Sequence, residues 1–138
     1  MALTQTDKAK QFRVLHEAPD AFVIANVWDG GSARMMAGLG FPALATSSGA
    51  SAGLLGRRDG TVTRDEALAQ ARVICDATDL PASADLEKGF GDSPDMVAET
   101  VRLAAEAGLV GCSMEDASGK ALPHPGQAQG AGCHLLSR

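Results

Sequence analysis

Short apolar segments and helical segments alternate along most of this chain. Apolar residues at near-helical spacing predict a first helix over about residues 4–17. An apolar segment at residues 21–27 then predicts a buried strand, which a loop at 28–31 connects to a short helix that Ser32 caps and Gly40 ends. A strand, a loop and a helix in this order are typical of a parallel β/α unit.

The second unit follows the same order. Residues 43–46 predict a strand, and the small residues at 47–53 predict a loop that lets a ligand approach the backbone closely. Thr63 and Glu66 have the spacing of a capping box, which predicts the start of the next helix. The polar segment between these two elements therefore forms a long connection near the end of the strand.

The third unit and the fourth strand complete the regular part of the sequence. Residues 80–84 predict a strand that leads into a glycine-rich turn at 88–92. Ser93 begins a helix that ends at Gly108, and residues 109–114 predict the fourth strand. Four such units with parallel crossovers fit either an open doubly wound sheet or half of an eight-stranded barrel.

The absence of a dinucleotide-binding motif decides between the open sheet and the half barrel. A dinucleotide-binding sheet would carry G-x-G-x-x-G after its first strand, and residues 29–32 do not provide it. We therefore predict an α/β fold of the (β/α)8 TIM-barrel type, with only about the first four β/α units present. The barrel half spans residues 1–118, and residues 119–138 predict an irregular, disordered tail because they are rich in loop formers. The abrupt change suggests a truncated or frame-shifted product.

Composition and charge argue against several classes of function. The 138 residues carry a net charge of −5, which argues against nonspecific binding to nucleic acid because such binding needs a basic face. The chain has no apolar segment long enough for a membrane span and no secretory signal pattern at its start, so we expect a cytoplasmic protein without a membrane partner. Cys75, Cys112 and Cys133 show no C-x-x-C spacing, and Cys75 and Cys112 are predicted to be small buried residues.

Acidic residues directly follow two of the predicted strands. Asp85 and Glu87 follow the third strand, while Glu115 and Asp116 follow the fourth. Parallel strands present their carboxyl ends at one edge, so we expect these four side chains to converge. Such carboxylates repel one another unless a cation or shared protons neutralise them, which suggests a divalent metal site.

Simpler explanations exist for each of these acids. Asp85 with Glu87 would also fit a solvated loop pair, Glu115 a helix cap, and Asp59 a turn residue. Trp28 directly follows the first strand, where it is either a core residue or part of the wall of a site.

Five ordered motifs between about residues 10 and 118 resemble the isocitrate lyase and phosphoenolpyruvate mutase superfamily. They are Asn-Val-Trp-Asp at 26–29, Thr-Ser-Ser-Gly-Ala at 46–50, Gly-Thr-Val-Thr-Arg-Asp-Glu at 60–66, Asp-Leu-Glu-Lys-Gly-Phe-Gly at 85–91, and Gly-Cys-Ser-Met-Glu-Asp at 111–116.

The resemblance implies a modified (β/α)8 barrel that binds Mg²⁺, with Mn²⁺ as an alternative, and a small α-oxo acid. It implies that Asp85 ligates the metal most directly and that the other acids support it largely through water. The implied residues are Asp85, Glu87, Glu115 and Asp59 for the metal, Asp59 and Glu115 for catalysis, and Trp28, Asp29, Ser47, Ser48 and Gly49 for the substrate.

The implied function is that of a lyase or mutase acting on C–C or P–C bonds of small α-oxo or α-hydroxy acids through an enolate. The sequence departs from the lyases of this family because it lacks their Lys-Lys-Cys-Gly-His loop. Two alternatives stay open: an oxaloacetate or phosphonopyruvate hydrolase, and a noncatalytic fragment that serves as an interaction module. We expect a homo-oligomer, and the later strands that would complete the pocket are missing, so activity of this chain by itself stays open.

Overall fold

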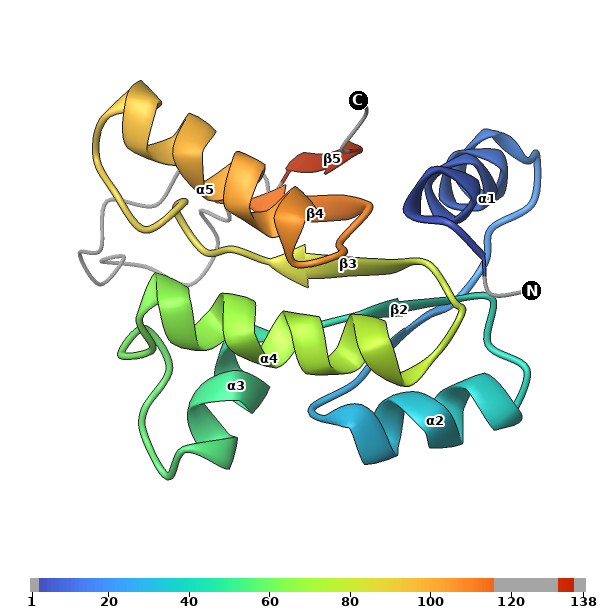
Figure 1. Ribbon diagram of the computed structural model, residues 1–138, viewed down its shortest axis with the longest axis horizontal. Helices are drawn as coiled ribbons and strands as arrows, with labels where there is room; N and C mark the ends of the chain where they lie inside the picture. The colour runs from blue at the N-terminus through green and yellow to red at the C-terminus, as the bar shows by residue number, and fades with distance from the viewer. Residues whose placement is uncertain (1–2, 116–131, 136–138) are drawn as a thin grey trace, which may run out of the picture.

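The strands form a single sheet in the order in which they occur in the sequence. The computed structural model describes residues 3–115 and 132–135. Four parallel strands are followed by one antiparallel strand at the edge, and Figure 1 shows them side by side. The strands are β1 (Ile24–Asn26), β2 (Ala43–Ala45), β3 (Ala82–Asp85), β4 (Gly111–Met114) and β5 (Gly132–Leu135).

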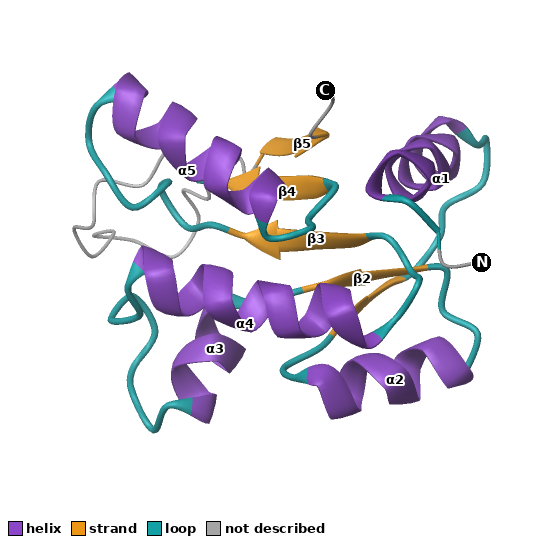
Figure 2. Ribbon diagram, in the orientation of Figure 1, coloured by secondary structure: helices purple, strands orange, loops and turns teal. Residues whose placement is uncertain are grey.

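Helices connect the parallel strands and cover the sheet, which confirms the α/β class. Figure 2 shows α2, α4 and α5 running alongside the strands, and their apolar side chains share one core with the strand residues that face them. None of the helices in the described ranges is long and apolar enough to cross a membrane. The helices are α1 (Gln5–Glu17), α2 (Gly30–Gly38), α3 (Ser48–Leu54), α4 (Arg64–Ala77) and α5 (Pro94–Glu106).

Local hydrogen bonds explain where the helices begin. The capping box predicted from Thr63 and Glu66 is present at the start of α4. At α2 the prediction was off by three residues, because Asp29 is the cap and Ser32 is the third residue of the helix. The Ser32 N–H donates to Asp29 Oδ1 (2.7 Å) and the Asp29 N–H donates to Ser32 Oγ (3.0 Å). The Asp29 carboxylate and the Ser32 hydroxyl thus each accept from the other residue's backbone N–H, which forms the capping box of α2.

The short helix α3 corrects the prediction of a loop after the second strand. Its small residues form no apolar stripe long enough to predict a helix. The turn is stabilised locally, since Ser47 caps it by accepting from the Ala50 N–H (3.4 Å) and the Ser51 hydroxyl donates to the Ser47 carbonyl (2.9 Å). Ser51 and Ala52 are also buried, and α3 packs against α4.

The first helix closes the amino-terminal end of the sheet. Figure 1 shows α1 beside the start of the strands, where Phe12 is completely buried against Ala43 and Val110. The ring fits there because Gly111 has no side chain: a Cβ at that position would lie 2.6 Å from Phe12 Cε1. A glycine at the start of β4 is therefore needed for the packing of α1.

The prediction of an irregular tail is wrong at four residues. Residues 132–135 form β5, which pairs antiparallel with β4 from Gly111 opposite Leu135 to Met114 opposite Gly132. The outer edge of β4 presents backbone donors and acceptors that a further strand can satisfy. A segment of four residues carries no periodic pattern that predicts this pairing. Residues 116–131 and 136–138 lie outside the described residues.

The two cysteines in the main domain are buried, as predicted. Cys75 on α4 and Cys112 on β4 both contribute to the core. Burial raises the pKa of the Cys75 thiol to about 11, so the thiol stays protonated and unreactive at neutral pH. The side chain of Cys133 lies outside those that the structure describes.

Replacing Gly111 tests the packing of α1. We expect Gly111→Ala to lower the free energy of unfolding by about 1–3 kcal/mol, because the new methyl group would overlap the Phe12 ring. Urea unfolding measures this change. Gly38→Ala is the matched control, since nothing lies within 4 Å of a Cβ at the exposed end of α2. If both variants have the same stability, Phe12 does not depend on Gly111.

Candidate active site

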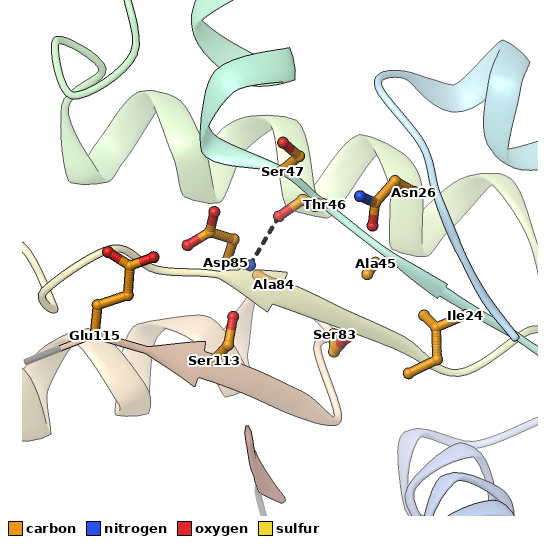
Figure 3. Close-up of a pocket in the computed structure, with 10 residues that line it drawn as sticks. All are labelled: Ile24, Asn26, Ala45, Thr46, Ser47, Ser83, Ala84, Asp85, Ser113 and Glu115. Carbon is orange, nitrogen blue, oxygen red and sulfur yellow. Dashed lines mark hydrogen bonds between the residues drawn. The ribbon is translucent and has the colours of Figure 1, made fainter. Parts of the chain in front are cut away.

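A cavity of about 370 Å³ opens beside the carboxyl ends of the parallel strands. Figure 3 shows the carboxylates of Asp85 and Glu115 on the same side of the sheet, at the ends of their strands, with Ile24 at the opposite end of the cavity. Its walls come from all four parallel strands and from the residues that directly follow them. The lining residues are Ile24, Asn26, Ala45, Thr46, Ser47, Ser83, Ala84, Asp85, Ser113 and Glu115.

Asp85 is the most firmly held acid of the site. It is the last residue of β3, and its backbone N–H donates to Thr46 Oγ1 (3.2 Å; Figure 3). Its carboxylate accepts from two backbone donors, the Ser48 N–H at Oδ2 (3.1 Å) and the Glu87 N–H at Oδ1 (3.0 Å). Charge-assisted bonds of this kind fix the orientation of a carboxylate, and each oxygen keeps a lone pair for another ligand.

Asp59 reaches the site from the connection between α3 and α4. Its Oδ2 atom would lie 3.4 Å from a Cβ at Gly49, so the glycine lets the carboxylate approach the first turn of α3. The connection is fixed to the start of α4, where Arg57 donates to both carboxylate oxygens of Glu66 (2.9 Å each). The connection between α3 and α4 therefore brings the Asp59 carboxylate close to Glu87 at the end of β3.

The other three acids of the site, Asp59, Asp85 and Glu115, act on Glu87. Partial burial and the negative charges of Asp59, Asp85 and Glu115, in that order, raise the pKa of Glu87. Its carbonyl accepts from the Glu115 N–H (2.7 Å), which connects the turn after β3 to the end of β4. Of the acids at the ends of the third and fourth strands, Asp85 and Glu115 are therefore close enough to Glu87 to act on it electrostatically, and so is Asp59.

The oxygen donors of this cluster could hold a hydrated divalent cation. None of the five ion pairs in the described ranges involves any of the four acids. Within residues 3–115 and 132–135, no three acidic, histidine or cysteine side chains lie close enough to ligate one ion together. An ion that keeps several of its waters fits this arrangement, because Asp85 can contact it while the other carboxylates bind its water ligands.

The substrate residues implied by the resemblance divide into two groups. Ser47 lines the cavity, and the Ser48 N–H binds Asp85 at its edge. Trp28 and Asp29 are not among the lining residues. The Asp29 carboxylate caps α2, and its pKa is lowered by its hydrogen bonds to Ser32. Trp28 is 56% exposed, so the interpretation of Trp28 as a core residue is wrong. Asp116 lies outside the described residues.

Four polar residues of the cavity were not predicted, and one of them, Thr46, directly follows β2. Asn26, Ser83 and Ser113 lie within strands and face the cavity between neighbours that face the helices. The strand period of two residues puts Ser83 on the same face as Asp85, and Ser113 on the same face as Glu115. This alternation along the strand is the sequence signal that identifies Ser83 and Ser113.

The raised pKa of Glu87 makes a prediction about pH. Its carboxyl binds a proton more tightly in the folded chain than in the unfolded chain, so stability falls as pH rises from about 4.3, the ordinary glutamate pKa, through the raised value. Without divalent cations, Glu87→Gln should therefore be more stable than wild type at pH 7.5, and the difference should vanish below pH 4. Urea unfolding in EDTA at both pH values measures this.

Asp92→Asn supplies the control for the pH experiment. Asp92 is exposed and pairs with Lys88 (2.6 Å), which lowers the pKa of its carboxyl, so its neutralisation should not stabilise the chain at pH 7.5. A Glu87→Gln variant that is less stable than wild type at pH 7.5 would show that the four acids do not repel one another in the folded protein.

Comparison with known proteins agrees with this architecture. The sequence model described as phosphoenolpyruvate phosphomutase matches residues 12–133. The chain is 34% identical over 114 residues to 2-methylisocitrate lyase of Bacillus subtilis (strain 168). The aligned region covers 82% of this chain and 38% of the lyase. The chain thus spans about two fifths of the length of this relative.

Solved structures show the same relationship. A crystal structure of a proposed lyase or mutase from Burkholderia cenocepacia J2315 superposes with a TM-score of 0.81 at 52% identity, over 84% of this chain and 41% of that protein. The structure of an oxaloacetate acetylhydrolase gives a TM-score of 0.72 at 32% identity, over 79% of this chain and 40% of that protein. The chain belongs to the phosphoenolpyruvate phosphomutase family, within the phosphoenolpyruvate mutase and isocitrate lyase superfamily.

Proposed function

We propose that this chain carries the metal-binding half of an active site that acts on small α-oxo or α-hydroxy acids. The reaction is the cleavage or rearrangement of a C–C or P–C bond by a lyase or mutase, through an enolate of the substrate. The observation that supports this most directly is that Asp85 and Glu115 line a cavity formed by four parallel strands, with Glu87 and Asp59 close enough to interact with them. None of the ion pairs among the described residues neutralises any of these four acids.

Mg²⁺ suits this site, with Mn²⁺ as the alternative. Asp85 would hold the ion directly, and Asp59, Glu87 and Glu115 would hold its water ligands. The bound cation supplies positive charge beside the oxygen on which negative charge develops when the bond next to the oxo group breaks. The backbone donors from Ser48 and Glu87 keep Asp85 in place before any ligand arrives, so little reorganisation is needed.

The first turn of α3 is the place for the acid end of the substrate. Ser47 Oγ accepts from the Ala50 N–H (3.4 Å), which leaves its own proton for a carboxylate or oxo oxygen in the cavity. Gly49 has no side chain, so the Asp59 carboxylate and a ligand beside it can come close to the backbone of this turn. The cavity volume of about 370 Å³ lies at the low end of the range for ligand sites, which supports a compact substrate.

Two types of reaction fit this site, the lyase or mutase reaction and the hydrolysis of an oxo acid. The usual cysteine-dependent lyase reaction is not proposed, because the sequence has no Lys-Lys-Cys-Gly-His segment. The similarity to an oxaloacetate acetylhydrolase supports hydrolysis of an oxo acid as the alternative. Both reactions would use the same carboxylates and differ in whether water captures the intermediate.

Metal binding tests the first part of the proposal. Isothermal titration of the 138-residue chain with Mg²⁺ should show one site, and Asp85→Asn should weaken it roughly tenfold or more because the direct ligand loses its charge. Asp79→Asn changes the charge equally on an exposed residue that precedes β3, at the other end of that strand. Equal Mg²⁺ affinities for the two variants would exclude Asp85 as the ligand.

Turnover tests the second part. Oxaloacetate and phosphonopyruvate are the substrates to assay, with Mg²⁺ and with EDTA, and product formation is followed by NMR. We expect turnover that requires Mg²⁺ and is lost in Asp85→Asn. Turnover that persists in EDTA would contradict the proposed chemistry.

A second candidate is a noncatalytic module that associates with another subunit. Among the described strands, β1 pairs only with β2, so its other edge has no strand partner. Such an edge favours pairing with another chain. If this is the function, the purified chain should be a folded homo-oligomer without turnover, and sedimentation velocity gives its mass. A monomer at all concentrations would rule out this candidate.

A further inference from the structure

The turn after β3 has an unusual backbone. Three of its residues lie in the left-handed region: Glu87 at φ 49°, Gly89 at φ 84° and Phe90 at φ 58°. Glycine adopts this conformation readily, but glutamate and phenylalanine do so at a cost. A strained turn of this kind persists only where its surroundings hold it in place.

A completely buried threonine on α5 holds this turn. Thr100 is 0% exposed, and its hydroxyl lies 2.8 Å from the Gly89 carbonyl oxygen and 3.0 Å from the Met96 carbonyl oxygen. Both partners are acceptors, so the single hydroxyl proton serves the two carbonyls. Val97, one turn earlier on α5, packs so closely that a Cβ at Gly89 would lie 3.0 Å from its Cγ2 atom.

Hydrogen bonds connect this turn to the backbone and side chains of the acids. The Gly89 N–H donates to the Leu86 carbonyl (2.8 Å), which closes the turn around Glu87. The Glu87 N–H donates to Asp85 Oδ1 (3.0 Å), and the Glu87 carbonyl accepts from the Glu115 N–H (2.7 Å). A displacement of Gly89 would therefore change the backbone that orients all three acids.

We propose that Thr100 is a positioning residue for the metal site, because its buried hydroxyl fixes the Gly89 carbonyl and so holds Glu87 beside Asp85 and Glu115. Thr100 is separated from the acids by the turn and acts only through it. The proposal rests on the proposed function, since it assigns the turn to the binding of a divalent cation. It predicts that the hydroxyl, and not the shape of the side chain, determines the affinity.

Two substitutions separate these properties. Thr100→Val keeps the shape and removes the donor, which leaves the Gly89 carbonyl without its side-chain partner. Thr100→Ser keeps the donor and removes only a methyl group. A purely structural role would make the Mg²⁺ affinity follow the stability of α5. Ala104→Gly is the matched control, because this buried residue of the same helix contributes to the core, lies one turn beyond Thr100 and has no hydroxyl to donate to the Gly89 carbonyl.

The experiment is isothermal titration of the 138-residue chain and its variants with Mg²⁺ alone, together with thermal unfolding of each. Thr100→Val should weaken Mg²⁺ binding roughly tenfold, as the loss of an outer hydrogen bond does at metal sites. Thr100→Ser should stay within about twofold of wild type, and so should Ala104→Gly although its melting temperature is lower. If Thr100→Val does not fold, Thr100→Ala replaces it in the same comparison.

The outcomes are distinguishable. Wild-type affinity in Thr100→Val, or an equal loss in Ala104→Gly, would overturn this inference and leave the proposed function intact. A wild-type chain that binds no Mg²⁺ would overturn the proposed function and this inference with it. Loss in Thr100→Val with recovery in Thr100→Ser supports the positioning role.

Discussion

The gathering of three other carboxylates around that of Glu87 is the constraint on which the site depends. Asp85 ends β3, Glu87 lies in the turn after it, Glu115 follows β4 and Asp59 lies between α3 and α4, yet the other three all act on Glu87. Ionising Glu87 in this cluster opposes folding, because burial and the neighbouring negative charges raise its pKa. In the proposed site, a hydrated cation bound between the carboxylates would offset this unfavourable electrostatic energy.

The same parallel sheet serves both the core and the cavity. Along each strand, one face packs apolar residues such as Leu44 and Cys112 against the helices. The other face presents small or polar residues such as Ser83 and Ser113, which leave room for a ligand. Phe12 closes the amino-terminal end above Gly111, so the opening lies at the end where the acids gather. Core packing thereby decides where the site can be.

The sequence predicted the fold well where a periodic pattern or a cap was present. The capping box at Thr63 placed α4, because that pattern depends only on neighbouring residues. The helix α3 and the strand β5 were missed, since the first is stabilised by local hydrogen bonds and buried small residues and the second by pairing with an edge. For the site, strand order predicted that Asp85 and Glu115 lie at the same edge of the sheet. The place of Ser113 in the cavity depends instead on which face of β4 its side chain occupies.

A crystal structure of the chain soaked with Mn²⁺, with data collected at a wavelength where manganese scatters anomalously, tests the central claim most directly. The account predicts one anomalous peak in direct contact with the Asp85 carboxylate, with water between the ion and Glu87, Glu115 or Asp59. The absence of a peak there, or a peak bound to residues elsewhere on the sheet, would contradict it.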